Sequence, residues 1–129
     1  MTVEFLENGS SDCPLIRIFG GQPEVCRQFR RAFEQLAEGG IGEISLTDLP
    51  GVEPIGGCRL VAQAGSRDKG IVRKGGNEFC WVLTPGTWNN VLDLIGPFCR
   101  AEAVGFQWLD QVPSSEARVL VSASSSGTW

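Results

Sequence analysis

The residue types that most often carry out acid–base chemistry are missing from this chain. None of its 129 residues is histidine or tyrosine. Histidine is the commonest general base near neutral pH, so no Ser-His-Asp triad, Cys-His pair or histidine metal site can form. The two lysines, Lys69 and Lys74, lie in a charged, glycine-rich stretch where a desolvated nucleophile is not expected. The fifteen carboxylates show no paired-acid motif, so we expect a protein that is not an enzyme.

Cysteine spacing also argues against a metal centre. There are five cysteines, and no two form a Cys-x-x-Cys pair, the arrangement that lets neighbouring thiolates converge on one ion. Each lies in or beside an apolar stretch, where a free thiol packs as a small hydrophobic group. The sequence therefore predicts no transition metal and no cofactor. The cysteines are Cys13, Cys26, Cys58, Cys80 and Cys99.

The start of the chain and its apolar stretches indicate a cytoplasmic protein. Residues 1–7 are acidic and lack the basic and apolar regions of a signal peptide. The longest stretch that is poor in charge, residues 79–99, is interrupted by proline, glycine and asparagine. A helix that spans a membrane needs ~20 mostly apolar residues, so we expect no membrane segment.

Two groups of basic residues are candidate anion sites. Residues 67–74 hold four basic side chains, but the net charge of −4 disfavours nucleic acid as a partner, because phosphate binding needs a coherent positive face. The first predicted helix carries three arginines with glutamates three or four positions away, which predicts a solvated face of ion pairs. These residues are Glu24, Arg27, Arg30, Arg31 and Glu34.

Aromatic residues are the most distinctive feature of the composition. The chain has four tryptophans and seven phenylalanines. In residues 79–83, Phe79 and Trp81 alternate and so share one face of a strand, and Phe106 and Trp108 repeat this arrangement. Trp88 lies on the apolar side of the second predicted helix.

These aromatic residues allow two hypotheses besides simple core packing. In the first, they form an exposed apolar face that binds a partner protein or a second copy of the chain. In the second, they line a cavity between sheet and helices that holds a small apolar or anionic molecule. In that case Arg17 or Arg59 would orient an anionic group. The candidate binding residues are Arg17, Arg59, Phe79, Trp81, Trp88, Phe106 and Trp108.

Hydrophobic periodicity and turn residues predict the elements that must position these side chains. The first helix begins at Pro23 and ends before Gly39, and the second follows Thr84 with Pro85 at its first position. The helices alternate with strands in the order β-α-β-β-β-α-β-β. The predicted strands cover residues 15–19, 43–48, 58–64, 78–83, 106–109 and 117–121.

This order predicts an α+β fold, a two-layer sandwich with a mainly antiparallel sheet of about six strands and both helices on one face. Split near residue 70, each half reads β-α-β-β, which hints at a pseudo-duplication. Residues 1–12 are expected to form a flexible acidic arm, and residues 13–129 a single domain.

The strands predicted at 15–19 and 79–83 are apolar on both faces, and such strands are normally covered on both sides. Two helices can cover only one side of a sheet. We therefore expect a homodimer, a protein partner or a small ligand against the open face, and a function in binding rather than catalysis.

Overall fold

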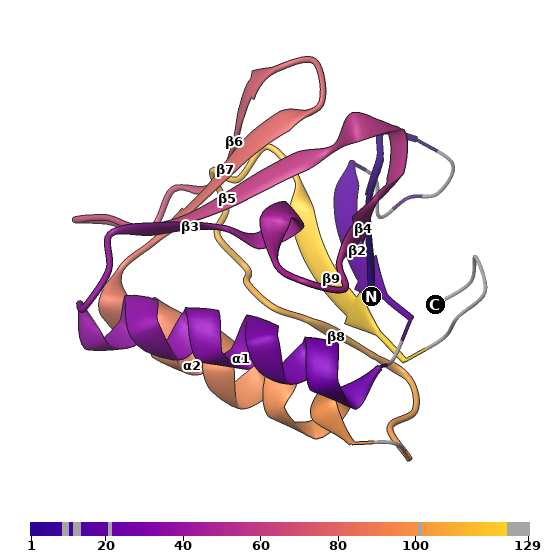
Figure 1. Ribbon diagram of the computed structural model, residues 1–129. Helices are drawn as coiled ribbons and strands as arrows, with labels where there is room; N and C mark the ends of the chain where they lie inside the picture. The colour runs from indigo at the N-terminus through magenta and orange to yellow at the C-terminus, as the bar shows by residue number, and fades with distance from the viewer. Residues whose placement is uncertain (9–10, 12–13, 21, 101, 124–129) are drawn as a thin grey trace.

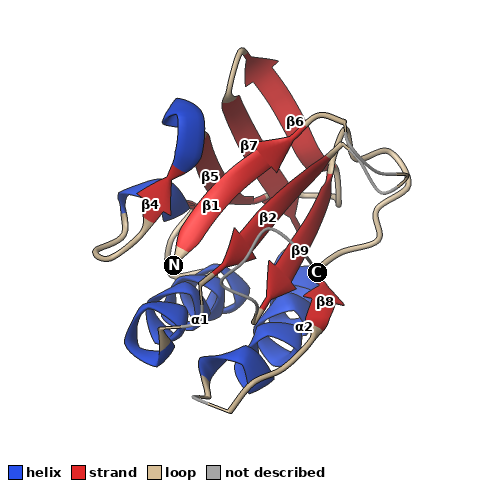
Figure 2. Ribbon diagram, turned by 90° about the vertical axis from the view of Figure 1, so that its right-hand side faces the viewer, coloured by secondary structure: helices blue, strands red, loops and turns tan. Residues whose placement is uncertain are grey.

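The computed structural model describes residues 1–8, 11, 14–20, 22–100 and 102–123. In this part of the chain, two α-helices and nine strands form an α+β fold with two mixed sheets (Figure 1). The helices lie side by side and form one layer, and both sheets rise from it (Figures 1 and 2). The helices are α1 (Pro23–Glu38) and α2 (Pro85–Ile95).

The first sheet joins the two ends of the described chain. Its strand order is β4-β1-β2-β9-β8, and β1 and β2 form an antiparallel pair. β9 lies parallel to β2 and antiparallel to β8, so the last strand is inserted beside an early one (Figure 2). The strands are β1 (Thr2–Leu6), β2 (Leu15–Phe19), β4 (Glu53–Pro54), β8 (Phe106–Trp108) and β9 (Arg118–Ser122).

The second sheet is formed by the middle of the chain in the order β3-β5-β7-β6. β3 and β6 are its antiparallel edge strands, and β5 and β7 form a parallel pair at its centre. The strands are β3 (Glu43–Ser45), β5 (Arg59–Ala64), β6 (Gly70–Gly75) and β7 (Glu78–Leu83).

The two halves of the chain have the same topology. In each half an antiparallel hairpin leads into a helix, and a second antiparallel pair follows: β1-β2-α1-β3-β5 and β6-β7-α2-β8-β9. In both halves the last strand pairs in parallel with the strand that precedes the helix of the other half. Neither half can therefore complete its sheet without the other.

The sheet arrangement corrects our sequence-based expectation. The single, mainly antiparallel sheet of about six strands is wrong, because β2 pairs in parallel with β9 and β5 with β7, which divides the strands between two sheets. Local patterns contain no information on such long-range pairing. Residues 2–6, which we expected in a loose arm, instead form β1 between β4 and β2. Residues 9, 10, 12 and 13 of that arm lie outside the described residues.

Both helices form where the sequence predicts them. Pro23 and Pro85 occupy the start of α1 and α2, where a missing N–H costs nothing. The Thr84 side chain caps α2 by accepting a hydrogen bond from the Thr87 N–H at 3.3 Å. Gly39 ends α1 with a φ of 76°, a left-handed conformation that favours glycine.

The aromatic core lies between the helix layer and the second sheet. Phe33 of α1 stacks on Trp88 of α2, with 5.3 Å between ring centroids, and meets the edge of Trp81 of β7 at 5.7 Å. Trp81 and Trp88 also contact each other edge to face at 4.8 Å. All three side chains are fully buried. The aromatic residues of the second sheet and of α2 therefore hold the layers together.

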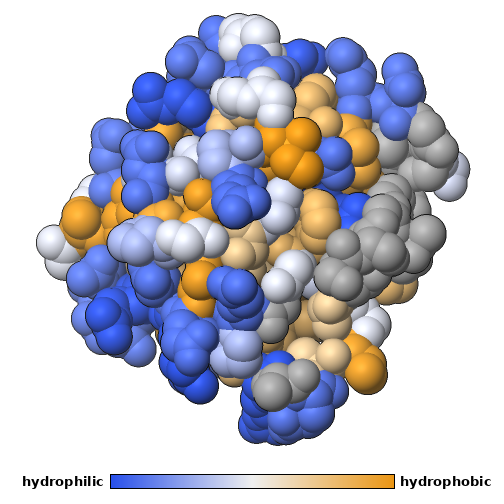
Figure 3. All heavy atoms as spheres, turned by 45° about the vertical axis from the view of Figure 1, so that its right-hand side comes forward, coloured by the Kyte–Doolittle hydropathy of each residue, from blue (hydrophilic) through white to orange (hydrophobic). Residues whose placement is uncertain are grey.

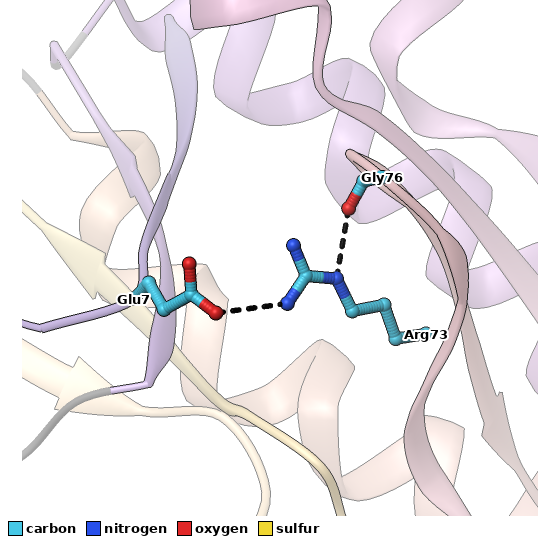
Figure 4. Close-up of polar contacts among 3 residues, drawn as sticks. All are labelled: Glu7, Arg73 and Gly76. Atoms are coloured by element: carbon cyan, nitrogen blue, oxygen red, sulfur yellow. Dashed lines mark hydrogen bonds and ion pairs between the residues drawn. The ribbon is translucent and has the colours of Figure 1, made fainter.

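A polar clamp joins the two sheets at the end distant from the helices (Figure 4). The Arg73 guanidinium of β6 lies 3.1 Å from a carboxylate oxygen of Glu7, and its Nε donates to the Gly76 carbonyl at 2.8 Å. The same guanidinium lies over the ring of Phe5, which in turn contacts Phe79 of β7. These contacts connect the two sheets, and Phe79 and Trp81 are buried, so the aromatic residues of β7 have no open face.

The charged side of α1 differs from its predicted form. In the part of the chain that the structure describes, no carboxylate lies within 4.0 Å of Arg27, Arg30 or Arg31. The predicted ion pairs are therefore absent, although the three side chains are exposed as expected. Exposed ion pairs gain little energy and cost side-chain entropy. Favourable spacing is therefore not enough to make them form.

These packing differences predict how two helix α1 variants behave. Phe33→Ala should lower the free energy of unfolding by about 3–5 kcal/mol, because it removes a ring that touches both buried tryptophans. Arg31→Ala, on the exposed side of the same helix, should change it by less than ~0.5 kcal/mol. Urea denaturation measures both values. A large loss in Arg31→Ala would show that this face is covered in solution.

Candidate functional site

A pocket of about 670 Å³ lies beside α2, and we call it the α2 pocket. One wall is the outward side of α2 with Thr87 and Asn90, and the other is the segment that continues from β8. Trp108 supplies a flat aromatic surface there. Two carboxylates, Asp68 and Asp110, line the same space.

Asp110 is positioned by the core of the protein. It follows Leu109, which is buried directly after β8, and its Oδ2 accepts a hydrogen bond of 2.5 Å from the Trp81 indole N–H. Burial raises the pKa of the Asp110 carboxyl, and the nearby charge of Asp68 adds to this effect. Hydrogen bonds from Trp81 and the Val112 backbone oppose the change without cancelling it. A proton is therefore held more tightly at Asp110 than at an ordinary aspartate.

Asp68 lies at the N-terminus of α2. One carboxylate oxygen accepts a hydrogen bond from the Thr84 N–H, and the other accepts from the Thr87 hydroxyl, both at 2.8 Å. Burial by itself would raise the pKa of Asp68, but these hydrogen bonds outweigh burial and lower the pKa. The positive end of the helix dipole also favours a negative charge at this position. Asp68 is thus held as a carboxylate.

The two acids of the α2 pocket therefore have pKa values displaced in opposite directions. Such pairs can act as an ionised anchor and a proton-holding partner. Around them, the side chains of Asn90, Gln107 and Gln111 offer amide donors and acceptors. The acids of the pocket can accept hydrogen bonds from a bound molecule, and the amides can both donate and accept them.

The first half of the chain has an equivalent groove with different chemistry. It has a volume of about 610 Å³ and lies between α1 and residues 41–49, which include β3, with Glu24, Arg27, Gln28 and Arg31 on the helix side. The two segments align as Leu46-Thr47-Asp48-Leu49-Pro50 and Leu109-Asp110-Gln111-Val112-Pro113. Both leucines are buried.

Thr47 therefore occupies the position of Asp110 in the first half. It is 6% exposed, and its hydroxyl accepts a hydrogen bond from the Leu60 N–H of β5 at 3.3 Å. A hydroxyl group is enough for the fold at this position. Asp110 is half-buried instead, accepts from the Trp81 N–H of the core and also lines the α2 pocket.

The candidate residues from the sequence are not brought together at one site. Phe79, Trp81 and Trp88 are buried, and the Trp88 indole N–H donates to the Gln63 carbonyl at 2.9 Å. Trp81 and Trp88 fill the space between the second sheet and the helices, where the second hypothesis placed a cavity, and Phe79 packs against Phe5 of the first sheet. These three side chains are therefore not accessible to a partner.

The remaining four candidates lie in three different parts of the fold. Arg17 is buried on the outward side of β2, where its guanidinium lies 3.6 Å from the centroid of Phe19. Arg59 is exposed at the start of β5. Phe106 is 47% exposed on the edge strand β8, and the half-buried Trp108 is the only one of the seven candidates that lines the α2 pocket.

The hydropathy of the surface fits this dispersal. In Figure 3, hydrophobic side chains form an interrupted band with hydrophilic residues between them, not one continuous patch. The described residues contain no group of three potential metal ligands, and none of the described helices is long and apolar enough to cross a membrane. The thiols of Cys26, Cys58 and Cys99 are free and buried.

Sequence reasoning missed both acids of the pocket. Asp110 forms its hydrogen bond with a residue 29 positions earlier, which no local pattern indicates. The available signal was the alignment of the two halves, in which a carboxylate replaces the threonine hydroxyl. For Asp68 the signal was its place in the loop before β6, but only the fold brings that loop to the start of α2.

Two substitutions of Asp110 should differ in their effect on stability. Asp110→Ala leaves the buried Trp81 N–H without an acceptor and should cost about 1–3 kcal/mol. Asp110→Asn keeps an oxygen for that bond and removes a half-buried charge, so at pH 7 it should be at least as stable as the wild type. Chemical denaturation of both variants at pH 7 measures the difference.

The pH dependence gives a further check on Asp110. A raised pKa in the folded state contributes stability below the unfolded value of ~3.9, and this contribution is lost as the pH rises through the folded value. The advantage of Asp110→Asn over the wild type should therefore shrink as the pH falls toward ~4. An advantage that grows on acidification would contradict the raised pKa.

Comparison of this chain with family models, with characterised proteins and with solved structures finds no match in any of the three. The comparison that the chain itself offers is between its two halves. It shows one fold pattern used twice, with arginines along the first groove and aspartates in the second.

Proposed function

We propose that this protein is a non-catalytic binding domain that holds a small polar molecule in the α2 pocket. The observation that carries the proposal is Asp110, a half-buried carboxylate that lines a pocket at a position where the other half of the fold uses a threonine. An uncharged oxygen could also accept from the Trp81 N–H, whereas a carboxylate has further acceptor capacity for a ligand. Binding of a ligand provides the reason for its presence.

The form of the α2 pocket supports the same proposal. Its volume of about 670 Å³ lies within the range of small-molecule sites, roughly 300–1,000 Å³. Apolar surface from Trp108 and Leu94 is combined with a few polar groups that could fix the orientation of a ligand. This is the small-molecule hypothesis from the sequence, at a different place and with different polar residues.

Binding rather than catalysis fits the surroundings of the two acids. Asp110 already accepts hydrogen bonds from Trp81 and Val112, and Asp68 from Thr84 and Thr87. These donors come from the fold and bond the ionised form of each acid. A general acid or base must exchange its proton during each reaction cycle, which such bonds oppose.

A second candidate function is association through the edge of the first sheet, and one observation favours it. β8 is an edge strand, and Phe106 on it is 47% exposed beside Val104, which is 84% exposed. Exposed strand edges with apolar side chains can pair with another chain. A homodimer or a protein partner at this edge is a modified form of the first hypothesis from the sequence, in which an exposed apolar face of the sheet binds another chain.

Sedimentation velocity tests the second candidate. If β8 mediates self-association, the protein should sediment as a dimer at micromolar concentration, and Phe106→Ser should shift it to the monomer. Arg59→Ser, an exposed substitution at the start of β5 on the other sheet, should leave the distribution unchanged. If the wild-type protein stays monomeric under these conditions, the homodimer proposal is wrong.

Ligand mapping by NMR tests the proposed function. Small polar compounds from a fragment library should shift the backbone amide signals of α2 and residues 107–114. Asn90→Phe fills the pocket and should abolish these shifts. Gln28→Phe introduces the same side chain at the equivalent position of α1, in the other groove, and should leave them intact.

The fragment experiment can also fail clearly. Compounds that cluster at another surface, or shifts that persist in Asn90→Phe, would show that the α2 pocket is not the binding site.

A further inference from the structure

Resting on the proposed function, we infer that the ligand of the α2 pocket carries a positively charged, planar nitrogen group of the amidinium or guanidinium type next to an apolar body. The inference specifies the class of ligand, since the pocket alone fixes only its size. It is supported by the charge of the lining, the shape of the walls and the way in which the two acids are held.

The charge of the lining has one sign. Among the described residues that line the pocket, Asp68 and Asp110 are the charged ones, and neither lysine nor arginine is present. Arg67 and Lys69 flank Asp68 in the sequence, but both are exposed and neither belongs to the lining. An anionic ligand would meet two acids without a compensating cation, whereas a cation would be attracted to both.

This charge reverses our sequence-based expectation of an apolar or anionic ligand. That expectation rested on Arg17 or Arg59, and neither lines the α2 pocket. The arginines of the equivalent groove, Arg27 and Arg31, lie along α1 instead.

The walls favour a planar cation. Trp108 is one of the lining residues, and aromatic faces attract cations through their quadrupole. The chain contains a precedent at this ring, because the guanidinium carbon of Arg118 lies 5.1 Å from the Trp108 centroid. Arg118 lines the neighbouring pocket, which shares Trp108 and Asp110 with the α2 pocket.

The two acids complement such a group in different ways. Asp68 is fixed as a carboxylate by donors from α2, so a permanent negative charge stands at the edge of the pocket. Asp110 accepts from Trp81 at Oδ2 and from the Val112 backbone, and a carboxylate keeps further acceptor capacity for a ligand. A planar cation with several N–H groups can bond an acid and an amide of Asn90 or Gln111 at once.

The experiment uses two probes of the same shape and different charge. Benzamidine has an amidinium group on an aromatic ring, and benzamide is its neutral counterpart. Titration of the full chain with each compound, followed by backbone amide shifts, should give a dissociation constant for benzamidine that is at least about tenfold lower, with shifts at α2 and residues 107–114.

Three variants locate the preference. Asp110→Asn and Asp68→Asn should each reduce the benzamidine preference at least severalfold and leave benzamide binding nearly unchanged. Asp48→Asn, an exposed acid in the equivalent segment of the first half, should keep the full preference. The amide spectrum of each variant reports whether it is folded. If Asp68→Asn does not fold, the result for Asp110→Asn alone tests the inference.

Each other outcome overturns the inference. Equal affinities for the two probes would show that charge does not select the ligand, and the proposed pocket would still be supported by their common shifts. A preference that survives in both pocket variants would place the cation elsewhere. If neither probe binds at millimolar concentration, the cationic class is wrong, and the fragment library decides separately whether the pocket binds small molecules.

Discussion

The side chain of Trp81 connects the core of this protein to its pocket. Its ring packs against Phe33 and Trp88, which join the second sheet to both helices. Its indole N–H donates to Asp110, which lies in the segment after β8 of the first sheet. A buried indole N–H requires an acceptor, so the core fixes the place of a carboxylate that the pocket uses. The packing of the layers and the chemistry of the α2 pocket therefore depend on the same residue.

The tandem topology explains why the molecule has two related grooves. Each half places a helix beside the segment that follows its third strand, and a groove forms between them. The halves are held together by the parallel pairs β2–β9 and β5–β7, and by the Arg73 clamp at the opposite end. The grooves differ in backbone as well as in side chains, since Leu46–Asp48 form a short 3-10 helix after β3 and α1 is longer than α2. Arginines along one and aspartates in the other give the two surfaces opposite charge.

Local features of the structure could be predicted from the sequence, and long-range ones could not. Pro23, Gly39 and the Thr84-Pro85 pair marked the helix ends correctly, because capping depends on neighbouring residues. The repeat in the structure is β-β-α-β-β and not the predicted β-α-β-β, because each half begins with a strand that we did not predict, β1 or β6. The parallel pairing was missed because the partner strands are joined by no turn. The hypothesis of an open aromatic face on β7 was wrong for the same reason. A fold with one sheet leaves such a face exposed, whereas the fold with two sheets buries it.

One pocket holds two carboxyl groups whose pKa values are displaced in opposite directions. Carbon-13 NMR measures these two pKa values most directly. The side-chain carboxyl carbons of Asp68 and Asp110 can be followed from about pH 2 to pH 7. The pKa of Asp110 should lie above the ordinary value of ~3.9, because burial disfavours its charge. The pKa of Asp68 should lie below it, because Thr84 and Thr87 bond its ionised form. Two titrations close to ~3.9, or the reverse order, would contradict the account.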